Sequence, residues 1–418
     1  DDYNKLAEEA EHIYNALPVE YRDAYYQLVL HPVKACANLN ELYITVGRNH
    51  LYSRQGRAGT NDLAAKAKYL FDKDAEHSRY YNRTLAGGKW NHMMDQTHIG
   101  YTTWQQPKEN VMPEVREINV PDVAEMGVAI DGSEDWWPQA KSMPVLPEFD
   151  VYQEQTYTIE VFNRGKVPFE YQAEAGVPWL LVTPAHGTVE KECYLSVRVD
   201  WQQAQSGTQH APITITGPHG SQVIVRAVIH NPLAPQKDQV QGFVEGNGYV
   251  SMEAEHCTRA VETESIRWQH IPGLGRTLSA MTTVPVTAPK QAPGGDSPRL
   301  EYCMHLFHGG PVKVRAYISP TLDFHNTGGL RYAVSFDDET PQVINVWTDA
   351  SNRAWEQAVS DNIKVAVSEH RLAGPGTHVL KFWMVDPGVV LEKLVVDTGG
   401  LRPSYLGPPE SFYQTARR

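Results

Sequence analysis

Long apolar runs, positive charge and cysteine are all scarce in this sequence, and each shortage excludes a class of protein. No apolar run approaches the roughly 20 residues that a membrane-spanning helix needs, so we expect no membrane association. Acidic residues outnumber basic ones by 50 to 37, which gives a formal charge of −13. Because nucleic-acid-binding surfaces are basic, we expect no nucleic-acid partner either. A water-soluble chain of 418 residues is long enough for two to four domains.

The few cysteines and the missing catalytic signatures narrow the chemistry further. Cys36, Cys193, Cys257 and Cys303 are widely spaced and show neither a CxxC nor a zinc-ligand pattern. The last two fall in one predicted domain, so a disulfide between them stays open beside the commoner outcome of buried free thiols. There is no GxSxG elbow and no glycine-rich phosphate loop after a strand, so we expect no nucleophilic triad and no cofactor.

The beginning of the chain shows neither an initiator methionine nor a signal peptide. Asp1 leads almost at once into a helical pattern. We therefore expect an internal starting point, with the chain being the later part of something longer and any targeting segment lying outside it.

The first 105 residues predict a helical bundle. Apolar residues recur there at helical spacing in three stretches, of which the middle one runs from Tyr25 to Val46. Pro32 falls inside this stretch and is expected to kink it. Thr60 or Asn61 is expected to cap the third helix.

Three arginines lie close to the turn between the second and third helical stretches. They are Arg48, Arg54 and Arg57. We expect them to form a solvated basic patch.

The remainder of the chain switches to the period-two pattern of β-strands. Residues 106–235 predict an immunoglobulin-like β-sandwich, and residues 236–400 predict a larger sandwich that resembles a carbohydrate-binding module. Residues 401–418 are proline-punctuated and are expected to form an extended tail. The predicted fold class is therefore multidomain α plus β, with an N-terminal helical bundle followed by two β-sandwich domains.

One irregular stretch, residues 86–107, closes the predicted bundle with the letters AGGKWNHMMDQTHIGYTTWQQP. It keeps neither helical nor strand periodicity and is dense in aromatic and hydrogen-bonding side chains, as binding loops often are. The candidate substrate-binding residues are Trp90, His92, Asp95, Gln96, His98, Tyr101 and Trp104. The alternative is that this loop only packs the bundle against a neighbouring domain. Its two histidines and aspartate lack a zinc-site spacing, so we expect no metal.

Two other groups of carboxylates could carry chemistry. DGSEDWWP, residues 131–138, sets three acids beside a tryptophan pair, but small sandwiches seldom form the deep cleft that glycosidic catalysis needs, so we expect a loop with solvated acids. Glu253, Glu255 and Asp397 could bind a structural Ca²⁺, or they could hydrogen-bond neighbouring loops. Both readings of these three residues stay open.

Long segments of the chain resemble glycoside hydrolase family 115. The resemblance lies in GGKWNHMMDQTHIGYTTWQQP and YYQLVLHPVKACANLNELY in the first part of the chain, in YVSMEAEH and WQHIPGLGRTLSAM, and in DPGVVLEKLVVDTGGLRPSYLGPPES near the end. The resemblance implies a xylan α-1,2-glucuronidase that removes glucuronic acid or its 4-O-methyl ether with inversion. It also implies a catalytic TIM barrel placed before the bundle.

No stretch of this chain reads as the eight βα units of a barrel. The resemblance therefore implies the C-terminal portion of such an enzyme, with no catalytic residue of its own and no activity alone. It further implies four things: a homodimer, glucuronoxylan or its oligosaccharides as ligand, a missing N-terminal catalytic part as partner, and a secreted or periplasmic location. A non-catalytic xylan-binding accessory protein is the alternative function.

Overall fold

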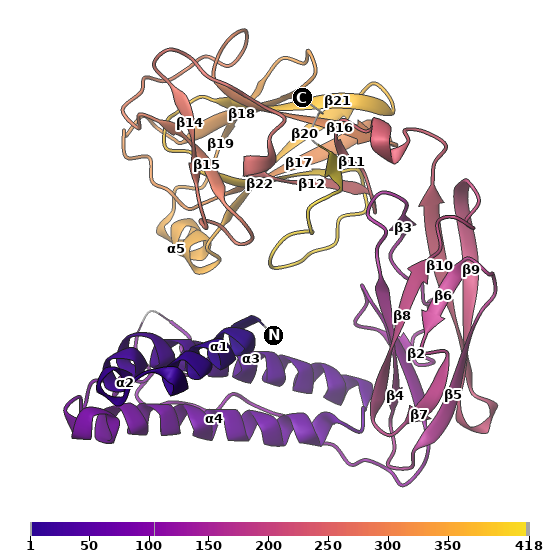
Figure 1. Cartoon of the computed structure of the whole chain (residues 1–418). Helices are drawn as coiled ribbons and strands as arrows, with labels where there is room; N and C mark the ends of the chain where they lie inside the picture. Colours follow the sequence, from indigo (N-terminus) through magenta and orange to yellow (C-terminus); the bar gives the residue numbers. More distant parts are fainter. Residues whose placement is uncertain (1, 104, 415–418) are drawn as a thin grey trace. The chain divides into compact units, whose positions relative to one another are not determined.

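The computed structural model describes residues 2–103 and 105–414 of the chain. They form two compact units. The first comprises Asp1–Leu146, Tyr157–Arg198 and Ala211–Arg226, and the second comprises Pro147–Thr156, Val199–His210 and Ala227–Arg418. Figure 1 shows helices at the start of the chain and strands after them. The predicted fold class is confirmed, whereas the predicted domain boundaries stay a prediction.

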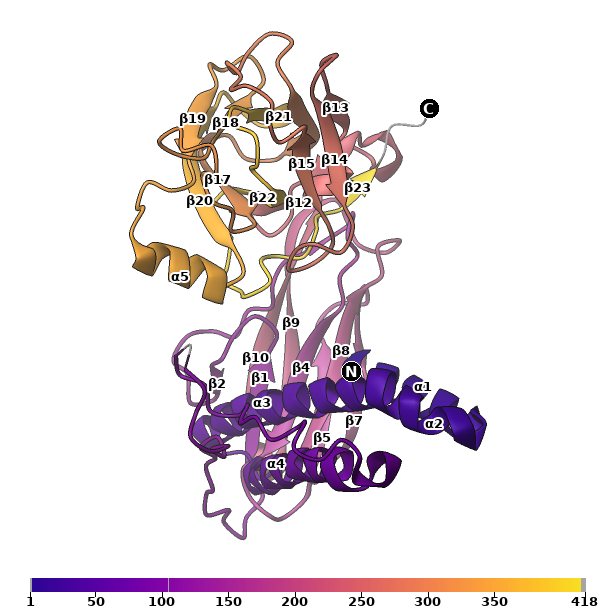
Figure 2. The ribbon, with the colours of Figure 1, turned by 90° about the vertical axis from the view of Figure 1, so that its left-hand side faces the viewer.

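The helices of the first unit begin with a broken helix and continue as a long antiparallel pair. Their bounds are α1 Asp2–Ala16, α2 Val19–Tyr25, the π-helical turn η1 Tyr26–Leu30, α3 His31–Gln55, α4 Thr60–Arg83 and the 3₁₀ turn η2 Leu85–Gly88. Figures 1 and 2 both show α3 and α4 side by side. Pro32 lies just after the π-helical turn, inside one continuous helical run over residues 19–55, and this π-helical turn stands where we expected a kink.

The predicted cap of the third helix is wrong. Gly59 occupies the N-cap position of α4, without a side-chain hydrogen bond. Thr60 is already helical, and its hydroxyl donates to the carbonyl oxygen of Arg57 at 2.7 Å. The first orphan N–H groups of α4 are therefore not satisfied by a side-chain cap from either predicted residue.

Two small cores hold the helices together. The first joins α1, η1 and the end of α4, and its buried members are Ala10, Tyr26, Leu30, Tyr81 and Leu85. The second joins α3, α4 and the following loop through Leu42, Val46, Ala67, Leu70 and Ile99. Because Ile99 is fully buried, the segment after α4 is anchored at that point.

The predicted basic patch is wrong for Arg57. This arginine is 1% exposed, and its guanidinium lies 4.3 and 4.1 Å from the ring centres of Tyr52 and Phe162. Its Nη1 donates to the carboxylates of Glu160 and Glu192. A planar, delocalised guanidinium can stack on rings and pair with carboxylates at once, which is why an arginine can be buried there.

The smaller sandwich contains two five-stranded sheets. One sheet has the order β2-β1-β4-β8-β6, with bounds Trp136–Trp137, Met126–Ile130, Tyr157–Asn163, Glu192–Val199 and Leu180–Thr183. The other has the order β3-β10-β9-β5-β7, with bounds Phe149–Asp150, Gln222–Asn231, Gly207–Thr216, Phe169–Ala175 and His186–Val189. Along β5 buried and exposed residues alternate, as the period-two pattern predicts.

The larger sandwich belongs to the second unit and has a seven-stranded and a six-stranded sheet. The seven-stranded sheet contains β11 Gly242–Val244, β13 Arg259–Val261, β16 Arg299–Leu306, β18 Arg331–Phe336, β19 Gln342–Asn345, β21 Gly376–Met384 and β23 Tyr413–Gln414. The six-stranded sheet contains β12 Tyr249–Glu253, β14 Arg267–Ile271, β15 Ala280–Val284, β17 Gly310–Ile318, β20 Lys364–Leu372 and β22 Leu391–Asp397. A short helix, α5 Asn352–Ser360, lies between β19 and β20 in the chain. Large apolar side chains such as Tyr302 and Phe382 fill the core of this sandwich.

The described part of the expected extended tail bonds to the larger sandwich. The backbone N–H of Ser411 donates to Ser251 O at 2.9 Å, and the backbone N–H of Ser251 donates back to Ser411 Oγ, also at 2.9 Å. Strand β23 then pairs with β11. Residues 401–414, which we call the strap, therefore run back over the larger sandwich.

Two further findings concern the chemistry of the chain. All four cysteines lie among the described residues and are free thiols, so Cys257 and Cys303 do not form a disulfide. Among the helices of residues 2–103 and 105–414, none is both long and apolar enough to cross a membrane.

Candidate functional site

The loop of residues 86–107 starts where α4 ends. Ala86 and Gly87 have φ values of +48° and +67°, so the chain reverses through a left-handed turn directly after the helix. The N–H of Gly87 donates to Thr84 O at 3.1 Å. The loop thus begins at a defined point beside the last turn of α4.

His92, Asp95 and Asn82 form the first polar network of the loop. His92 Nδ1 lies 2.5 Å from Asp95 Oδ2, and Asn82 Nδ2 donates to Asp95 Oδ1 at 2.7 Å. The N–H of Met94 donates to Asn82 Oδ1 at 2.8 Å, which ties the loop backbone to α4. The His92 side chain is 78% exposed, so its Nε2 faces solvent and remains able to bind an outside group.

His98 forms the second network and faces the helix. Its Nε2 lies 2.8 Å from the buried Asp74 Oδ2, and its Nδ1 lies 2.9 Å from Gln96 O. Burial lowers the pKa of His98, but the hydrogen bonds to Gln96 O and Asp74 outweigh burial, and the pKa is raised above its usual value. Both ring nitrogens face acceptors, so this geometry favours the imidazolium form.

The remaining predicted residues divide between packing and exposure. Trp90 is partly buried against the first bundle core, and Lys89 Nζ lies 4.8 Å from its ring centre. Gln96 Nε2 donates to Tyr101 Oη at 3.3 Å, and Tyr101 is 45% exposed. Trp104 lies outside the residues that the structure describes.

The structure therefore joins the predicted residues in pairs rather than around one centre. His92 pairs with Asp95 and Gln96 with Tyr101, whereas His98 turns to α4. No group of three or more His, Cys, Asp or Glu side chains able to hold a metal ion occurs among residues 2–103 and 105–414. What the loop offers to a ligand is the exposed His92 imidazole and the phenol of Tyr101, groups suited to hydroxyl or carboxylate contacts.

Sequence reasoning missed two residues on which the loop depends, Asp74 and Asn82. Both lie on α4 and are buried. Asp74 follows Ala67 and Leu70 along the buried stripe of the helix, and a carboxylate on such a stripe requires a partner. The carboxylate of Asp74 on this stripe was the signal in the sequence that a partner must exist, and in the structure that partner is His98.

The acids of residues 131–137 are exposed, as expected, and two of them have partners in the protein. Glu134 is an exposed partner of Arg54 at 2.9 Å, and Asp131 Oδ2 accepts the N–H of Thr158. Trp137 is buried, and Arg164 lies 4.3 Å from the ring centre of Trp136. This arrangement builds the loop and covers the core, so we do not assign catalysis to it.

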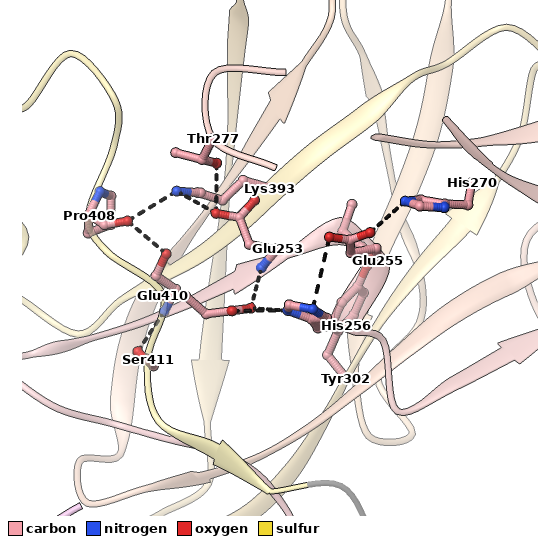
Figure 3. Close-up of polar contacts among 12 residues, drawn as sticks. Glu253, Glu255, His256, His270, Thr277, Tyr302, Lys393, Pro408, Glu410 and Ser411 are labelled. Carbon is pink, nitrogen blue, oxygen red and sulfur yellow. Dashed lines mark hydrogen bonds and ion pairs between the residues drawn. The ribbon is translucent and has the colours of Figure 1, made fainter. Parts of the chain in front are cut away.

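Two acids of the second predicted carboxylate group, Glu253 and Glu255, lie beside the strap of the larger sandwich, as Figure 3 shows. Glu253 and Lys393 are both buried, and their carboxylate and ammonium lie 3.0 Å apart. Thr277 Oγ1 also donates to Glu253 Oε1, at 2.7 Å, while Lys393 Nζ donates to Pro408 O of the strap at 3.1 Å. A lysine ammonium therefore lies beside the carboxylate that the calcium interpretation requires as a ligand.

The other two acids of that group have partners of their own. Glu255 Oε2 lies 2.5 Å from His270 Nε2, and Asp397 Oδ2 lies 3.3 Å from Arg315 Nη2. His256 Nδ1 is 2.8 Å from Glu410 Oε1 of the strap. Calcium takes six to eight oxygen ligands at one point, whereas these carboxylates each face a nitrogen cation or imidazole. The hydrogen-bonding interpretation fits the geometry.

The fold and these contacts define a multidomain α plus β protein with a helical bundle and two β-sandwiches. Residues 242–410 match the family model described as Glycosyl hydrolase family 115 C-terminal domain. This match confirms the resemblance to that family over the larger sandwich and most of the strap.

The solved structures to which the chain is similar include a glucuronidase and a carbohydrate-binding module. One is described as a family GH115 4-O-methyl-α-glucuronidase with specificity for decorated arabinogalactans; it has 16% identity and a TM-score of 0.49, over 94% of this chain and 32% of that one. A family 35 carbohydrate-binding module from Clostridium thermocellum has 10% identity and a TM-score of 0.26, over 35% of this chain and 97% of that one. The chain thus spans about a third of the length of the glucuronidase. No curated protein matches the chain.

Proposed function

We propose that the chain is the C-terminal region of an inverting xylan α-1,2-(4-O-methyl)glucuronidase, where it supports a catalytic barrel and lines part of the substrate cleft. The observation that carries this proposal is the family match of residues 242–410. It is supported by the loop of residues 86–107, which leaves an imidazole and a phenol exposed at the end of a rigid helix pair.

Within such an enzyme the loop would form one wall of the cleft. Barrel active sites open at the C-terminal ends of the strands, where a neighbouring domain can contribute side chains. His92 Nε2 would hydrogen-bond a hydroxyl or uronate of the glycan, and the Tyr101 ring would stack on a sugar face. Asp95 and Asn82 would orient His92 through its other ring nitrogen.

The catalytic pair of carboxyl groups belongs to the barrel in this proposal. Inverting glycosidases hold the two carboxyl groups about 6.5–9.5 Å apart across the scissile bond. We therefore expect the 418-residue chain alone to release no uronic acid from glucuronoxylan. Release of uronic acid by the purified chain would contradict the proposal.

The role of the loop is tested in the assembled enzyme that joins this chain to a barrel. We expect His92→Gly and Tyr101→Ala each to lower kcat/KM about tenfold, the size of effect that a lost substrate contact of 1.4 kcal/mol gives. Tyr69→Ala is the matched control, since Tyr69 is 61% exposed on α4. Unchanged activity of both loop variants would mean that the loop only packs against the barrel.

The substrate, the assembly and the location are parts of the same proposal. Glucuronoxylan and decorated arabinogalactan should be compared as substrates, because the glucuronidase quoted above is described with the latter. We propose a homodimer, to be tested by light scattering of the eluting protein, and a secreted or periplasmic location, to be tested by fractionation of the producing cells. A monomer at micromolar concentration would contradict the first, and a purely cytoplasmic enzyme the second.

A further inference from the structure

A hollow of about 540 Å³ lies at one edge of the larger sandwich, between two loops and α5. We call it the Trp355 hollow, and the residues that matter to it are Asp323, Phe324, Asn326, Trp347 and Trp355. One loop joins β17 to β18, and the other joins β19 to α5. Figures 1 and 2 show α5 at the edge of this sandwich. Its volume falls within the roughly 300–1,000 Å³ of small-ligand sites.

The tryptophan wall of the hollow is held in place from behind. Trp347 Nε1 donates to Thr321 O at 2.8 Å, and its ring packs against the sandwich core. The ring centres of Trp347 and Trp355 are 5.3 Å apart with planes at 53°. Lys364 Nζ lies 5.4 Å from the Trp347 ring centre. Trp347 is therefore held in place, and the ring of Trp355 packs against it.

Another aromatic ring that lines the hollow lies on a loop that Asp323 organises. Asp323 Oδ2 accepts the N–H of Gly329 at 2.8 Å, and its Oδ1 accepts that of Thr327 at 3.2 Å. Phe324 lies over Gly388, where an added Cβ would come within 2.5 Å of the ring. Although it is held there, Phe324 remains 54% exposed. An exposed ring on an ordered loop is the form that ligand-stacking residues take.

Two polar groups of the hollow have no hydrogen-bond partner among the described residues. They are the indole N–H of Trp355 and the side-chain amide of Asn326, although both residues line the hollow. Asn326 has a φ of +52°, a left-handed conformation that asparagine tolerates. The hollow thus combines aromatic surface with a free donor and a free donor–acceptor pair.

We propose that the Trp355 hollow binds a neutral pyranose ring of a glycan chain. The C–H face of the sugar lies on Trp355 and Phe324, and its hydroxyls bond to the Trp355 indole N–H and the Asn326 amide. The carboxylate of Asp323 lines the same hollow, so a uronate would meet a like charge there. Only the choice of xylan oligosaccharides as the probe rests on the proposed function.

The test is calorimetric titration of the full chain with xylohexaose, and with cellohexaose as a second neutral glycan. We expect binding of a neutral glycan that Trp355→Ala weakens more than tenfold, as loss of a stacking tryptophan does. Asn326→Gly removes the amide while keeping the left-handed backbone, and we expect it to weaken binding about threefold to tenfold, the range for one lost hydrogen bond.

A matched control variant distinguishes loss of the binding site from a general effect of the substitution on the fold. Asn362→Gly makes the same change at another exposed left-handed asparagine, at φ +54°, outside the hollow, and should leave binding unchanged. Normal binding by Asn326→Gly would overturn the proposal even if Trp355→Ala unfolds α5. Failure of both neutral glycans to bind, or tighter binding of a glucuronic-acid-bearing oligosaccharide than of its neutral parent, would overturn it too. Because uronic acid release is not measured, these outcomes are independent of the proposed catalytic context.

Discussion

The loop of residues 86–107 and the Trp355 hollow both combine aromatic rings with polar side chains, yet they use them in opposite ways. In the loop, most polar groups bond to one another or to α4, as His98 does with Asp74. In the hollow, the Asn326 amide and the Trp355 N–H have no partner among the described residues, and the rings beside them are open. A high density of polar and aromatic residues alone therefore does not identify a binding site. What identifies one is polar groups left unsatisfied beside accessible apolar surface.

A third polar cluster lies under the strap, and its charges are buried. We therefore expect substitutions in this cluster to have the largest effect on stability. Lys393→Met removes the ammonium and leaves the Glu253 carboxylate buried beside a single hydroxyl. We expect the free energy of unfolding of the larger sandwich to fall by about 3–5 kcal/mol, the usual cost of breaking a buried ion pair. Urea denaturation measures it, and the double variant with Glu253→Gln should recover most of the loss. A loss below about 1 kcal/mol would mean that this pair is not truly desolvated.

Asp74 should give the next largest effect, since it is a buried acceptor for a half-exposed histidine. Asp74→Ala leaves His98 without its carboxylate and should cost about 2 kcal/mol, as expected for a hydrogen bond to a charged group. Hydrogen exchange of residues 96–99 reports it locally. Asp72→Ala, an exposed acid on the same helix, is the control. Equal protection in both variants would show that His98 does not anchor the loop.

The pH dependence of the two regions should have opposite signs. The pKa of His98 is raised in the folded protein, so its contribution is fully present below about pH 6.5 and is lost as the pH rises through the folded value. The pKa of Asp323 is lowered, chiefly by the N–H of Gly329, so its contribution is present above about pH 3.9 and is lost as the pH falls through the folded value. NMR titration of the His98 ring and of the Asp323 carboxyl, with exchange rates corrected for intrinsic pH effects, checks both directions. Loop protection that grew with pH would contradict the first.

His92→Gly should have the smallest effect on stability. The pair with Asp95 is exposed, and such pairs contribute about 0–1 kcal/mol. His92 also has a φ of +71°, a left-handed conformation that glycine adopts at a lower conformational cost than other residues. We expect a net change within about 0.5 kcal/mol by thermal unfolding. A much larger loss would mean that His92 holds the loop together rather than facing outward.

Much of the sheet structure could be predicted because alternation is a local property. Residues 331–336 lie in the part of the chain with the period-two pattern and form β18. Strand β20 departs from that pattern, because its exposed positions include Val365 and Val367, while Ser368 and His370 are buried. Its polarity is inverted relative to the usual pattern. The imidazole is tolerated inside because His370 Nδ1 bonds Glu339 at 2.8 Å.

The sites were harder to predict because their partners are distant in sequence. Arg57 is buried only because Glu160 and Glu192 lie beside it. A local sequence pattern around Arg57 cannot predict these carboxylates, because they are more than a hundred residues away in the chain. The Trp355 hollow similarly needs two loops that topology brings together. The loop of residues 86–107 was found because its residues are contiguous, but its anchor Asp74 was not.

The most direct test is an indole NMR titration of the ¹⁵N-tryptophan-labelled chain with xylohexaose, with resonances assigned by Trp→Phe variants. We expect the Trp355 indole resonance to shift on titration, while that of Trp90, in the loop, does not. A shift at Trp90 with Trp355 unchanged would contradict this expectation, and would place the sugar-binding site of the isolated chain in the loop.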